Sequence, residues 1–525
     1  MNKRETGRAG PLLVGVDAGT TNTKAIIVDL AGRVVAEASE PTRIEYPRPE
    51  WAEYAAETLW EVTARAIRRA VAQLDDPRRI EGVAVASMAE TAVPLDAKGA
   101  ATGPAIAWFD KRTRAELALI EERVGPDRLF AISGLAPEPI FGLCKLLWHK
   151  RHRPESFART VKWLNAADYL AWRLSGEMAT DYSLASRTFA LDLGARQWSR
   201  EVLEAVGVDP ALMAPLVRSG QKVGTVQADA ASATGLPRHC VVAAGGHDHM
   251  VGSVAADAMR PGVMLLSTGT TEAILMGRDS PGRDPALGRA GYAQGLMWVD
   301  EPVYYVMGGV FTAGGAIEWF RRTLGAGAGA GAEGADYATL MAEAEAVPPG
   351  SLGALFLPQL RLGTPPHIDG HARGAFLGLS TDITRGCLFR AVLEGIAADS
   401  RLCVEGMLRL LPAEPPREVR VIGGLTRNAL YMAIRSAVAG RPLGIVDLPD
   451  GVAAGAALLA GLGAGLHPTL AAGLAAMRPP EREITPDAAL AGLYDRLVRE
   501  AYAPAYPTVQ SLHEAAQKVI AAGRG

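Results

Sequence analysis

Two short glycine-threonine turns are the first part of the chain whose residue types and spacing suggest chemistry. One turn follows Asp17 and the apolar run 12–16, and the other follows the apolar run 263–267. Tight turns of this kind expose main-chain N–H groups and hydroxyls that can wrap phosphate oxygens. The residues expected to bind phosphate are Thr20, Thr21 and Asn22 in the first turn and Thr268, Gly269 and Thr270 in the second. Asp17 would lie beside that phosphate, where a carboxylate can hold Mg²⁺ directly or through water.

A second candidate is the segment 245–249, Gly-Gly-His-Asp-His, directly after the apolar run 240–244. A carboxylate at the end of a buried strand, next to glycines, can approach a substrate closely and accept a proton from its hydroxyl. Asp248 is therefore predicted to be the catalytic base. The alternative is metal binding by His247 and His249 around Asp248, for which no third ligand at suitable spacing is visible. Whether the two histidines contact substrate stays open.

A third candidate is the segment 423–428, Gly-Gly-Leu-Thr-Arg-Asn, between an apolar run and a helical pattern. Gly423 and Gly424 would let a flat ligand lie against the main chain, and Asn428 offers a donor and an acceptor for a purine edge. The segment does not have the glycine spacing of the dinucleotide motif GxGxxG, and no acidic residue about twenty positions later supports that interpretation.

Alternating patterns of strands and helices must position these residues. In the first half, strands are predicted at residues 12–16, 24–29, 33–38 and 83–87, and a helix at residues 51–74. In the second half, strands are predicted at residues 263–267, 272–276 and 419–422, and a helix at residues 428–439. The repeat of strand, glycine-threonine turn and strand predicts two related α/β domains. We place the first at residues 1–251, the second at 252–480, and a helical C-terminal extension at 481–525.

The composition limits the classes of function. The 54 basic and 57 acidic residues are mixed along the chain, so nothing indicates a nucleic-acid or membrane partner. Four cysteines without a CxxC pair, and an N-terminus without an apolar stretch, predict a cytoplasmic protein. The longest apolar run, residues 452–466, is short for a membrane span and is predicted to form a buried helix of small residues.

The order of the motifs resembles the FGGY carbohydrate kinases of the actin/hexokinase/Hsp70 ATPase superfamily, from residue 14 to about residue 464. Besides the segments above, the resemblance rests on Glu90 and on the segments 108–112 (WFDKR), 145–148 (KLLW), 165–169 (NAADY), 180–186 (TDYSLAS), 374–379 (GAFLGL) and 391–394 (AVLE). It implies two ribonuclease-H-like domains around a cleft, with sugar mainly on the first and ATP mainly on the second. It also implies that Asp248 is the base, and that Glu90 and Asp110 contact substrate hydroxyls.

The departures from the family concern the sugar. Residues 88–91 read Met-Ala-Glu-Thr, where glycerol kinases carry Gln-Arg-Glu-Thr and xylulokinases Gln-Met-His-Gly. His249 stands where xylulokinases usually carry Asn. For Trp108, Lys145 and Trp148, packing is at least as well supported as substrate contact.

The sequence therefore predicts an ATP- and Mg²⁺-dependent kinase of a small sugar, with a ketopentose such as xylulose as the first choice. A polyol or a deoxy-ketose is the alternative acceptor, and a sugar-independent ATPase is the alternative activity. The oligomeric state stays open, with a homodimer as the form common among relatives.

Overall fold

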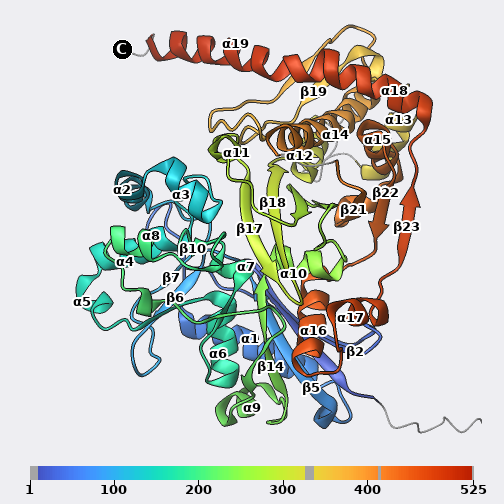
Figure 1. Cartoon of the computed structure of the whole chain (residues 1–525). Coiled ribbons are helices and arrows are strands. Elements are labelled where there is room, and N and C mark those ends of the chain that lie inside the picture. Colours follow the sequence, from blue (N-terminus) through green and yellow to red (C-terminus); the bar gives the residue numbers. More distant parts are fainter. Residues whose placement is uncertain (1–9, 325–335, 412–414, 523–525) are drawn as a thin grey trace, which may run out of the picture.

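A computed structural model describes residues 10–324, 336–411 and 415–522 and contains two large mixed β-sheets (Figure 1). The first sheet has the strand order β13 (Lys222–Thr225), β14 (Val241–His247), β5 (Ile80–Ser87), β1 (Leu12–Ala18), β2 (Asn22–Asp29) and β3 (Val34–Pro41). The second has the order β17 (Ala293–Trp298), β18 (Pro302–Val310), β16 (Glu272–Arg278), β15 (Val263–Thr268), β21 (Glu418–Ile422), β22 (Leu443–Val446) and β23 (Glu481–Ile484).

The two sheets share one topology. In the first, β1, β2 and β3 are antiparallel, and β5 and β14 then run parallel to β1. In the second, β15, β16 and β18 are antiparallel, and β21 and β22 run parallel to β15. This repeat confirms the predicted α/β fold class with two related, actin-like halves.

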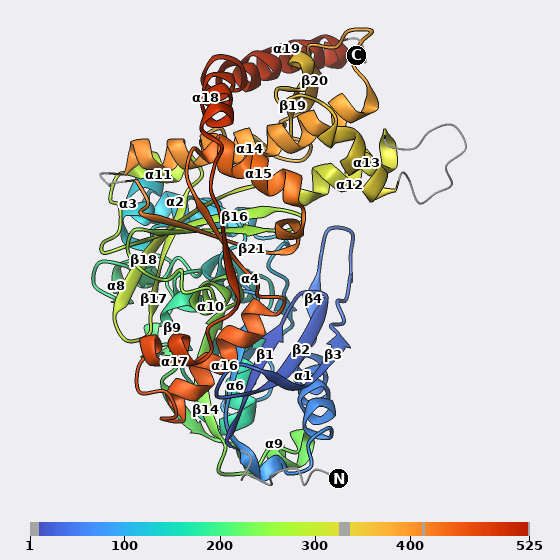
Figure 2. The same cartoon turned by 90° about the vertical axis from the view of Figure 1, so that its right-hand side faces the viewer.

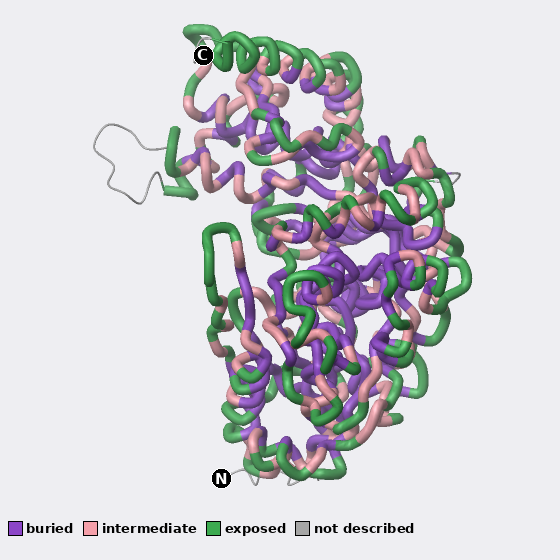
Figure 3. Tube along the Cα trace, turned by 90° about the vertical axis from the view of Figure 1, so that its left-hand side faces the viewer, coloured by how far each residue is buried: buried purple, intermediate pink, exposed green. Residues whose placement is uncertain are grey.

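Helices cover both faces of each sheet, and two of them lie between the sheets (Figure 2). The helices between the sheets are α10 (Asp248–Ala255) and α16 (Gly451–Gly463). On the outer faces lie α1 (Ala56–Val71) and α6 (Ala166–Ser175) against the first sheet, and α12 (Gly314–Thr323), α14 (Arg385–Leu410) and α15 (Ala429–Ala439) against the second. Buried residues therefore run through the centre of both halves (Figure 3).

A smaller helical cluster lies beside the first sheet and has its own apolar core. It contains α2 (Arg114–Val124), α3 (Pro126–Ser133), α4 (Gly142–His152) and α5 (Pro154–Phe157). The short helix α7 (Tyr182–Ala185) connects this region to the cleft between the sheets. The sequence patterns did not predict this cluster.

The predicted strands and helices are found with shifted ends. The helix expected at residues 51–74 begins at Ala56, because Glu53–Tyr54 forms the short strand β4. The apolar run 452–466 forms the buried helix α16, as predicted. No helix of the described residues is both long and apolar enough to cross a membrane.

The region predicted as a helical C-terminal extension needs a correction. It begins with the strand β23, which pairs with β22 and becomes the edge of the second sheet. Three of the four residues of β23 are charged and exposed, as is common in edge strands. Because β23 lacks an apolar run, the sequence pattern did not predict it as a strand. Helical structure follows in α18 (Ala488–Leu497), a π-helical turn (Val498–Tyr502) and α19 (Ala503–Ala522).

The domain boundary after residue 251 stays a prediction. It falls within α10, which packs against α16 between the two sheets. Although α16 comes late in the chain, it lies against β1 and β5 of the first sheet, where a Cβ on Gly15 would come within 1.8 Å of the Ala453 carbonyl oxygen.

Candidate functional site

The carboxyl ends of three parallel strands meet at one edge of the first sheet. Ala18 of β1 and His247 of β14 both align with Ser87 of β5. The residues that follow these strands therefore lie close together. A bulge in β14 brings Gly245 so near to β5 that a Cβ there would lie 1.8 Å from the Val85 carbonyl oxygen. Glycine at this position lets the main chain approach closely and directs Asp248 into the cleft.

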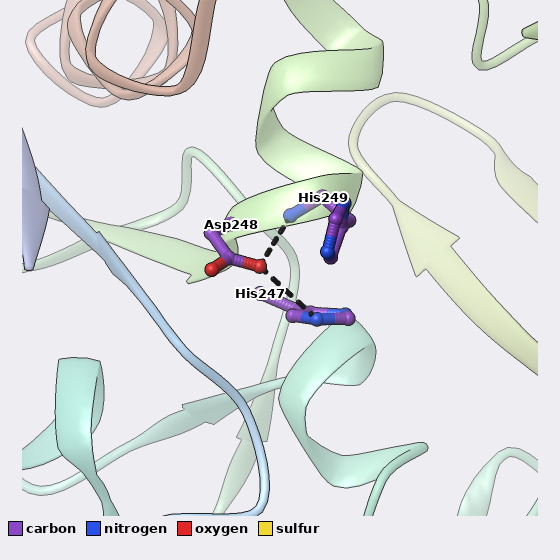
Figure 4. Close-up of side chains that lie close together, drawn as sticks. All are labelled: His247, Asp248 and His249. Atoms are coloured by element: carbon purple, nitrogen blue, oxygen red, sulfur yellow. Dashed lines mark hydrogen bonds and ion pairs between the residues drawn. The ribbon is translucent and has the colours of Figure 1, made fainter. Parts of the chain in front are cut away.

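Asp248 is the first residue of α10, and both neighbouring histidines contact its carboxylate (Figure 4). The main-chain N–H of His249 donates to Oδ1 at 2.6 Å, and the His247 Nε2 lies 3.1 Å from the same oxygen. Burial raises the pKa of Asp248, but His249 and His247 outweigh it and lower this pKa to about 2. The carboxylate is therefore ionised throughout the physiological pH range.

The three side chains of this turn also form a candidate metal group. Their ligand atoms lie within 4.8 Å of one another, the one such trio among the residues that the structure describes. Within this trio the His247 Nε2 lies 3.1 Å from the Asp248 Oδ1, so His247 is also placed as a hydrogen-bond partner of the carboxylate.

Glu90 lines the same cleft as Asp248 and is paired with a residue that the sequence did not single out. The Arg187 Nε donates to the Glu90 carboxylate at 2.6 Å, and both side chains are more than nine-tenths buried. The Nη1 atom of Arg187 is buried and has no hydrogen-bond partner. Arg187 directly follows the 180–186 motif, and this position was the available sequence signal.

These groups line a cleft of about 450 Å³ between the two halves of the molecule. The first half contributes Glu90, Arg187 and Asp248, and the second contributes the start of β16 and the end of β18. Apolar contacts come from Met88, Ala89, Trp108, Ile140, Met307 and Phe311. One residue of each glycine-threonine turn, Thr20 and Thr271, reaches the same cleft.

Asp17 lies near two further carboxylates at this edge. Burial raises the pKa of Asp17 to about 7, Asp248 and Asp450 add to the rise, and Lys24 opposes it. The Lys24 Nζ lies 2.7 Å from the Asp450 carboxylate, so one of the three carboxyl groups already has a cationic partner. The other two, Asp17 and Asp248, would suit Mg²⁺, which favours one or two carboxylates together with phosphate oxygens. The residues present therefore fit a magnesium ion.

The first turn is held by hydrogen bonds that leave its end exposed. The Gly19 N–H donates to the Asn22 carbonyl oxygen at 3.0 Å, and the Trp108 indole donates to the Thr20 hydroxyl at 2.9 Å. Thr21 and Asn22 are exposed. Thr20 lines the cleft, and the predicted phosphate contacts at Thr21 and Asn22 are accessible to solvent.

The second turn is one residue shorter than the first and has a supporting segment that the sequence did not single out. The Gly269 N–H donates to the Thr271 carbonyl oxygen at 2.8 Å, while the Thr268 hydroxyl donates to the Ile422 carbonyl oxygen at 3.1 Å. The N–H groups of residues 313–315, at the start of α12, donate to the carbonyl oxygens of Gly269 and Thr270. The pair Gly314-Gly315 after β18 was a recognisable sequence signal for this contact.

The segment at 423–428 lies directly beside this second turn. Gly423 has a φ of +106°, and a Cβ there would come within 2.1 Å of the Thr268 carbonyl oxygen, so only glycine fits. A Cβ on Gly424 would meet nothing within 4 Å. Asn428 caps α15 by accepting from the Tyr431 N–H, and its amide donates to the Tyr337 hydroxyl at 2.6 Å. Its predicted hydrogen bonds to a purine would have to replace these contacts.

Asp110 lies apart from the cleft lining. Its carboxylate is fully buried, is bound by the Arg112 guanidinium at 2.6 Å, and accepts from the Ala52 N–H at 2.7 Å. Arg112 also pairs with Glu53 and lies over the Trp51 ring. The structure gives Asp110 a supporting role in this buried ionic cluster, and a substrate contact would need it to exchange these partners.

A second cavity of about 530 Å³ lies between α14, α15, α18 and the second sheet. Its charged side chains are paired within the protein, as in the Arg401–Asp495 and Arg435–Glu272 contacts. It contains none of the predicted site residues. Of these two cavities, the cleft around Asp248 is the one that contains predicted site residues.

Comparison with known proteins gives matches over nearly the whole chain. "FGGY family of carbohydrate kinases, N-terminal domain" matches residues 12–255, and the C-terminal domain of the same family matches residues 264–464. A xylulose kinase from Bacillus subtilis is 29% identical over 87% of this chain and 89% of its own length. A glycerol kinase from Gloeobacter violaceus is 31% identical over 90% and 91%. The crystal structure of xylulose kinase from Rhodospirillum rubrum superposes with a TM-score of 0.85 and 31% identity, covering 95% of this chain and 99% of that one.

Proposed function

The chain belongs to the FGGY family of carbohydrate kinases, and from this premise we propose that it phosphorylates a neutral ketopentose such as xylulose, with Asp248 as the general base. The coarser activity follows from the family: it is an ATP-dependent sugar kinase, a phosphotransferase with an alcohol group as acceptor. The position of Asp248, in one cleft with Glu90 and with residues of both glycine-threonine turns, carries the finer proposal.

Asp248 would orient the acceptor hydroxyl and take its proton as the phosphoryl group is transferred. Transfer of a phosphoryl group proceeds through a loose transition state, in which positioning matters more than a strong base. A carboxylate with a pKa of about 2 suits this task, because it is always ready to accept a hydrogen bond. In this proposal a fall in rate at acidic pH does not reflect protonation of Asp248, because the pKa of this carboxylate is about 2.

The phosphate end of the reaction would lie between the two turns. In this proposal residues 20–22 and 268–270 would hold phosphate oxygens, with Asp17 at the metal position. The Gly269 N–H and the Thr268 hydroxyl would then exchange their present partners within the protein. When bound, Mg²⁺ would neutralise charge on the phosphates. Adenosine would lie against Gly423 and Gly424. Residues 1–251 would thus hold the sugar and the first turn, and residues 252–480 would hold ATP.

The charges in the cleft favour a neutral acceptor. Arg187 neutralises Glu90 and Arg435 neutralises Glu272, which leaves Asp248 as the carboxylate of the described lining that no arginine pairs. A sugar acid would bring its own carboxylate into this surrounding, at a cost of several kcal/mol. The xylulose kinase relatives support a ketopentose as first choice, while Glu90 and the glycerol kinase relative support a polyol as the alternative.

A coupled ADP-release assay over ketopentoses, deoxy-ketoses, polyols and aldonates tests the proposal. We expect the highest kcat/KM with a ketopentose, and values at least about 100-fold lower with aldonates, because about 2.7 kcal/mol of repulsion gives that ratio. ADP release without added sugar should be a small background. A preference for an aldonate would contradict the neutral acceptor, and sugar-independent release at the full rate would contradict the kinase.

The open space beside Gly424 provides a test of the adenosine position. Gly424→Ala adds a methyl group that meets no protein atom, so the melting temperature should stay within about 1 °C. If adenosine lies against this residue, the methyl group should raise the KM for ATP by about 10-fold, since overpacking commonly costs 1–3 kcal/mol. Gly423→Ala is the comparison, because its Cβ clashes with the Thr268 carbonyl and should lower both stability and ATP affinity. An unchanged KM for ATP in Gly424→Ala would place adenosine elsewhere.

A further inference from the structure

Lys145 on α4 is fully buried and does not line the cleft. Its Nζ donates to the main-chain oxygen of Glu90 at 2.7 Å and to that of Ala107 at 2.8 Å. Burial lowers the pKa of Lys145 to about 7, although Glu90 and Asp110 act in the opposite direction. Burying an amino group is costly unless its hydrogen bonds are satisfied. The two carbonyl groups that Lys145 contacts therefore indicate which segments it holds in place.

The first of these carbonyl groups belongs to a strained residue of the cleft. Glu90 has a φ of +60°, in the left-handed region that residues other than glycine rarely adopt. Such a conformation costs about 1–3 kcal/mol and persists only where the surroundings enforce it. The bond from Lys145 fixes the carbonyl side of this peptide, while Arg187 holds the carboxylate on the cleft side.

The second carbonyl group belongs to Ala107, in another segment beside the cleft. Ala107 precedes Trp108, whose ring lines the cleft and whose indole N–H donates to the Thr20 hydroxyl of the first phosphate turn. A single buried amino group therefore joins the segment that carries Glu90 to the segment that carries Trp108. Glu90 and Ala107 lie in the two arms of one hairpin, which is paired nearer its tip through the Leu95–Ala101 bridge and the Thr102 N–H bond to the Pro94 carbonyl oxygen, so Lys145 fixes the open end of the hairpin.

We propose that Lys145 is a positioning residue for the acceptor, which sets the distance between the Glu90 carboxylate and the Trp108 ring from behind the cleft. The inference rests on the proposed function, since it takes these two side chains as the walls of the sugar site. Removing Lys145 would leave the nucleotide segments of the second sheet unchanged, because both of its contacts lie in the first half of the molecule.

Lys145→Met tests the inference by steady-state kinetics with xylulose, and with glycerol in parallel. Losing hydrogen bonds from a charged donor is worth about 1.5–3 kcal/mol, so the KM for the sugar should rise by about 10–100-fold. The KM for ATP should stay within about 3-fold of the wild type. Sugar-independent ADP release should also be retained, which reports an intact nucleotide site.

Leu146→Ala is the matched control on the same helix, since it opens a cavity in the neighbouring apolar core and leaves both Lys145 contacts in place. It should lower the melting temperature without changing the KM for the sugar by more than about 3-fold. If Lys145→Met does not fold, Lys145→Gln, which keeps an N–H donor without the charge, is measured in the same way. A folded Lys145 variant with an unchanged sugar KM, or with equal losses for sugar and ATP, would overturn the inference.

Failure of the inference is distinguishable from failure of the proposed function. The proposed function fails if the wild-type protein shows no sugar-dependent ADP release with either acceptor. The positioning role of Lys145 is judged only from the ratio of variant to wild type, with the acceptor that the wild type uses. A wild type active with glycerol and not with xylulose changes the acceptor assignment, and the Lys145 comparison is then made with glycerol.

Discussion

Asp248→Asn is expected to lower kcat by about 10²–10⁴-fold while the fold and ATP binding are retained. The amide is similar in size to the carboxylate and still accepts the N–H of His249, which holds the residue at the start of α10 (Figure 4). It cannot take a proton from the acceptor hydroxyl, and the loss of a general base commonly costs this factor. Single-turnover measurements with saturating ATP and sugar would isolate the transfer step.

His249→Asn is the matched control for this prediction. The hydrogen bond from residue 249 to Asp248 comes from the main chain, so the substitution keeps it. We expect kcat to fall by no more than about 10-fold, because the lost imidazole only lowers the pKa of the Asp248 carboxylate. An Asp248→Asn protein with near-normal kcat would remove Asp248 from the role of base.

The repeated strand pattern is the part of the fold that local sequence signals could predict. Buried strands such as β1 and β15 are continuous apolar runs that end at a glycine-threonine turn, and this combination occurs in both halves. The placement of α16 could not be predicted in this way. A helix of glycine and alanine is apolar on all sides, so its sequence gives no face and no partner, and only the structure shows it against the first sheet.

The site could be predicted where a residue follows a strand end, and not where it depends on distant contacts. Asp17 and Asp248 lie at the ends of aligned parallel strands, which a strand pattern indicates. Asp450 and Arg187 reach the same edge from a helix start and from a loop, and no local spacing connects them with the cleft.

Two predicted contacts stay predictions that carry a condition. The family resemblance implies a substrate contact for Asp110, and the donor and acceptor of the side-chain amide suggest a purine contact for Asn428. In the structure, a neighbouring guanidinium and a helix cap already use their polar atoms. A polar residue in a family motif can thus support the site from within the protein, as we also infer for Lys145.

Arg187→Met is expected to have a large effect on both stability and sugar use. Removing one partner of a buried ion pair leaves the other charge uncompensated, which costs about 3–5 kcal/mol. Glu90 would be that charge, since its carboxylate is nearly inaccessible and is bound by the Arg187 Nε. The kcat/KM for the sugar should fall by about 100-fold or more, while the KM for ATP should change little. Thermal unfolding and steady-state kinetics on the same samples would measure the two effects.

The double variant Glu90→Gln/Arg187→Met separates stability from recognition. It contains no unpaired buried charge, so it should melt at a higher temperature than Arg187→Met alone, as expected for coupled partners. Its kcat/KM for the sugar should nevertheless stay low, because neither the carboxylate nor the guanidinium is there to bind hydroxyls. If sugar use recovered together with stability, the pair would be a structural ion pair that happens to border the cleft. If the double variant stayed as unstable as the single one, the buried charge of Glu90 would not be the cause of the loss.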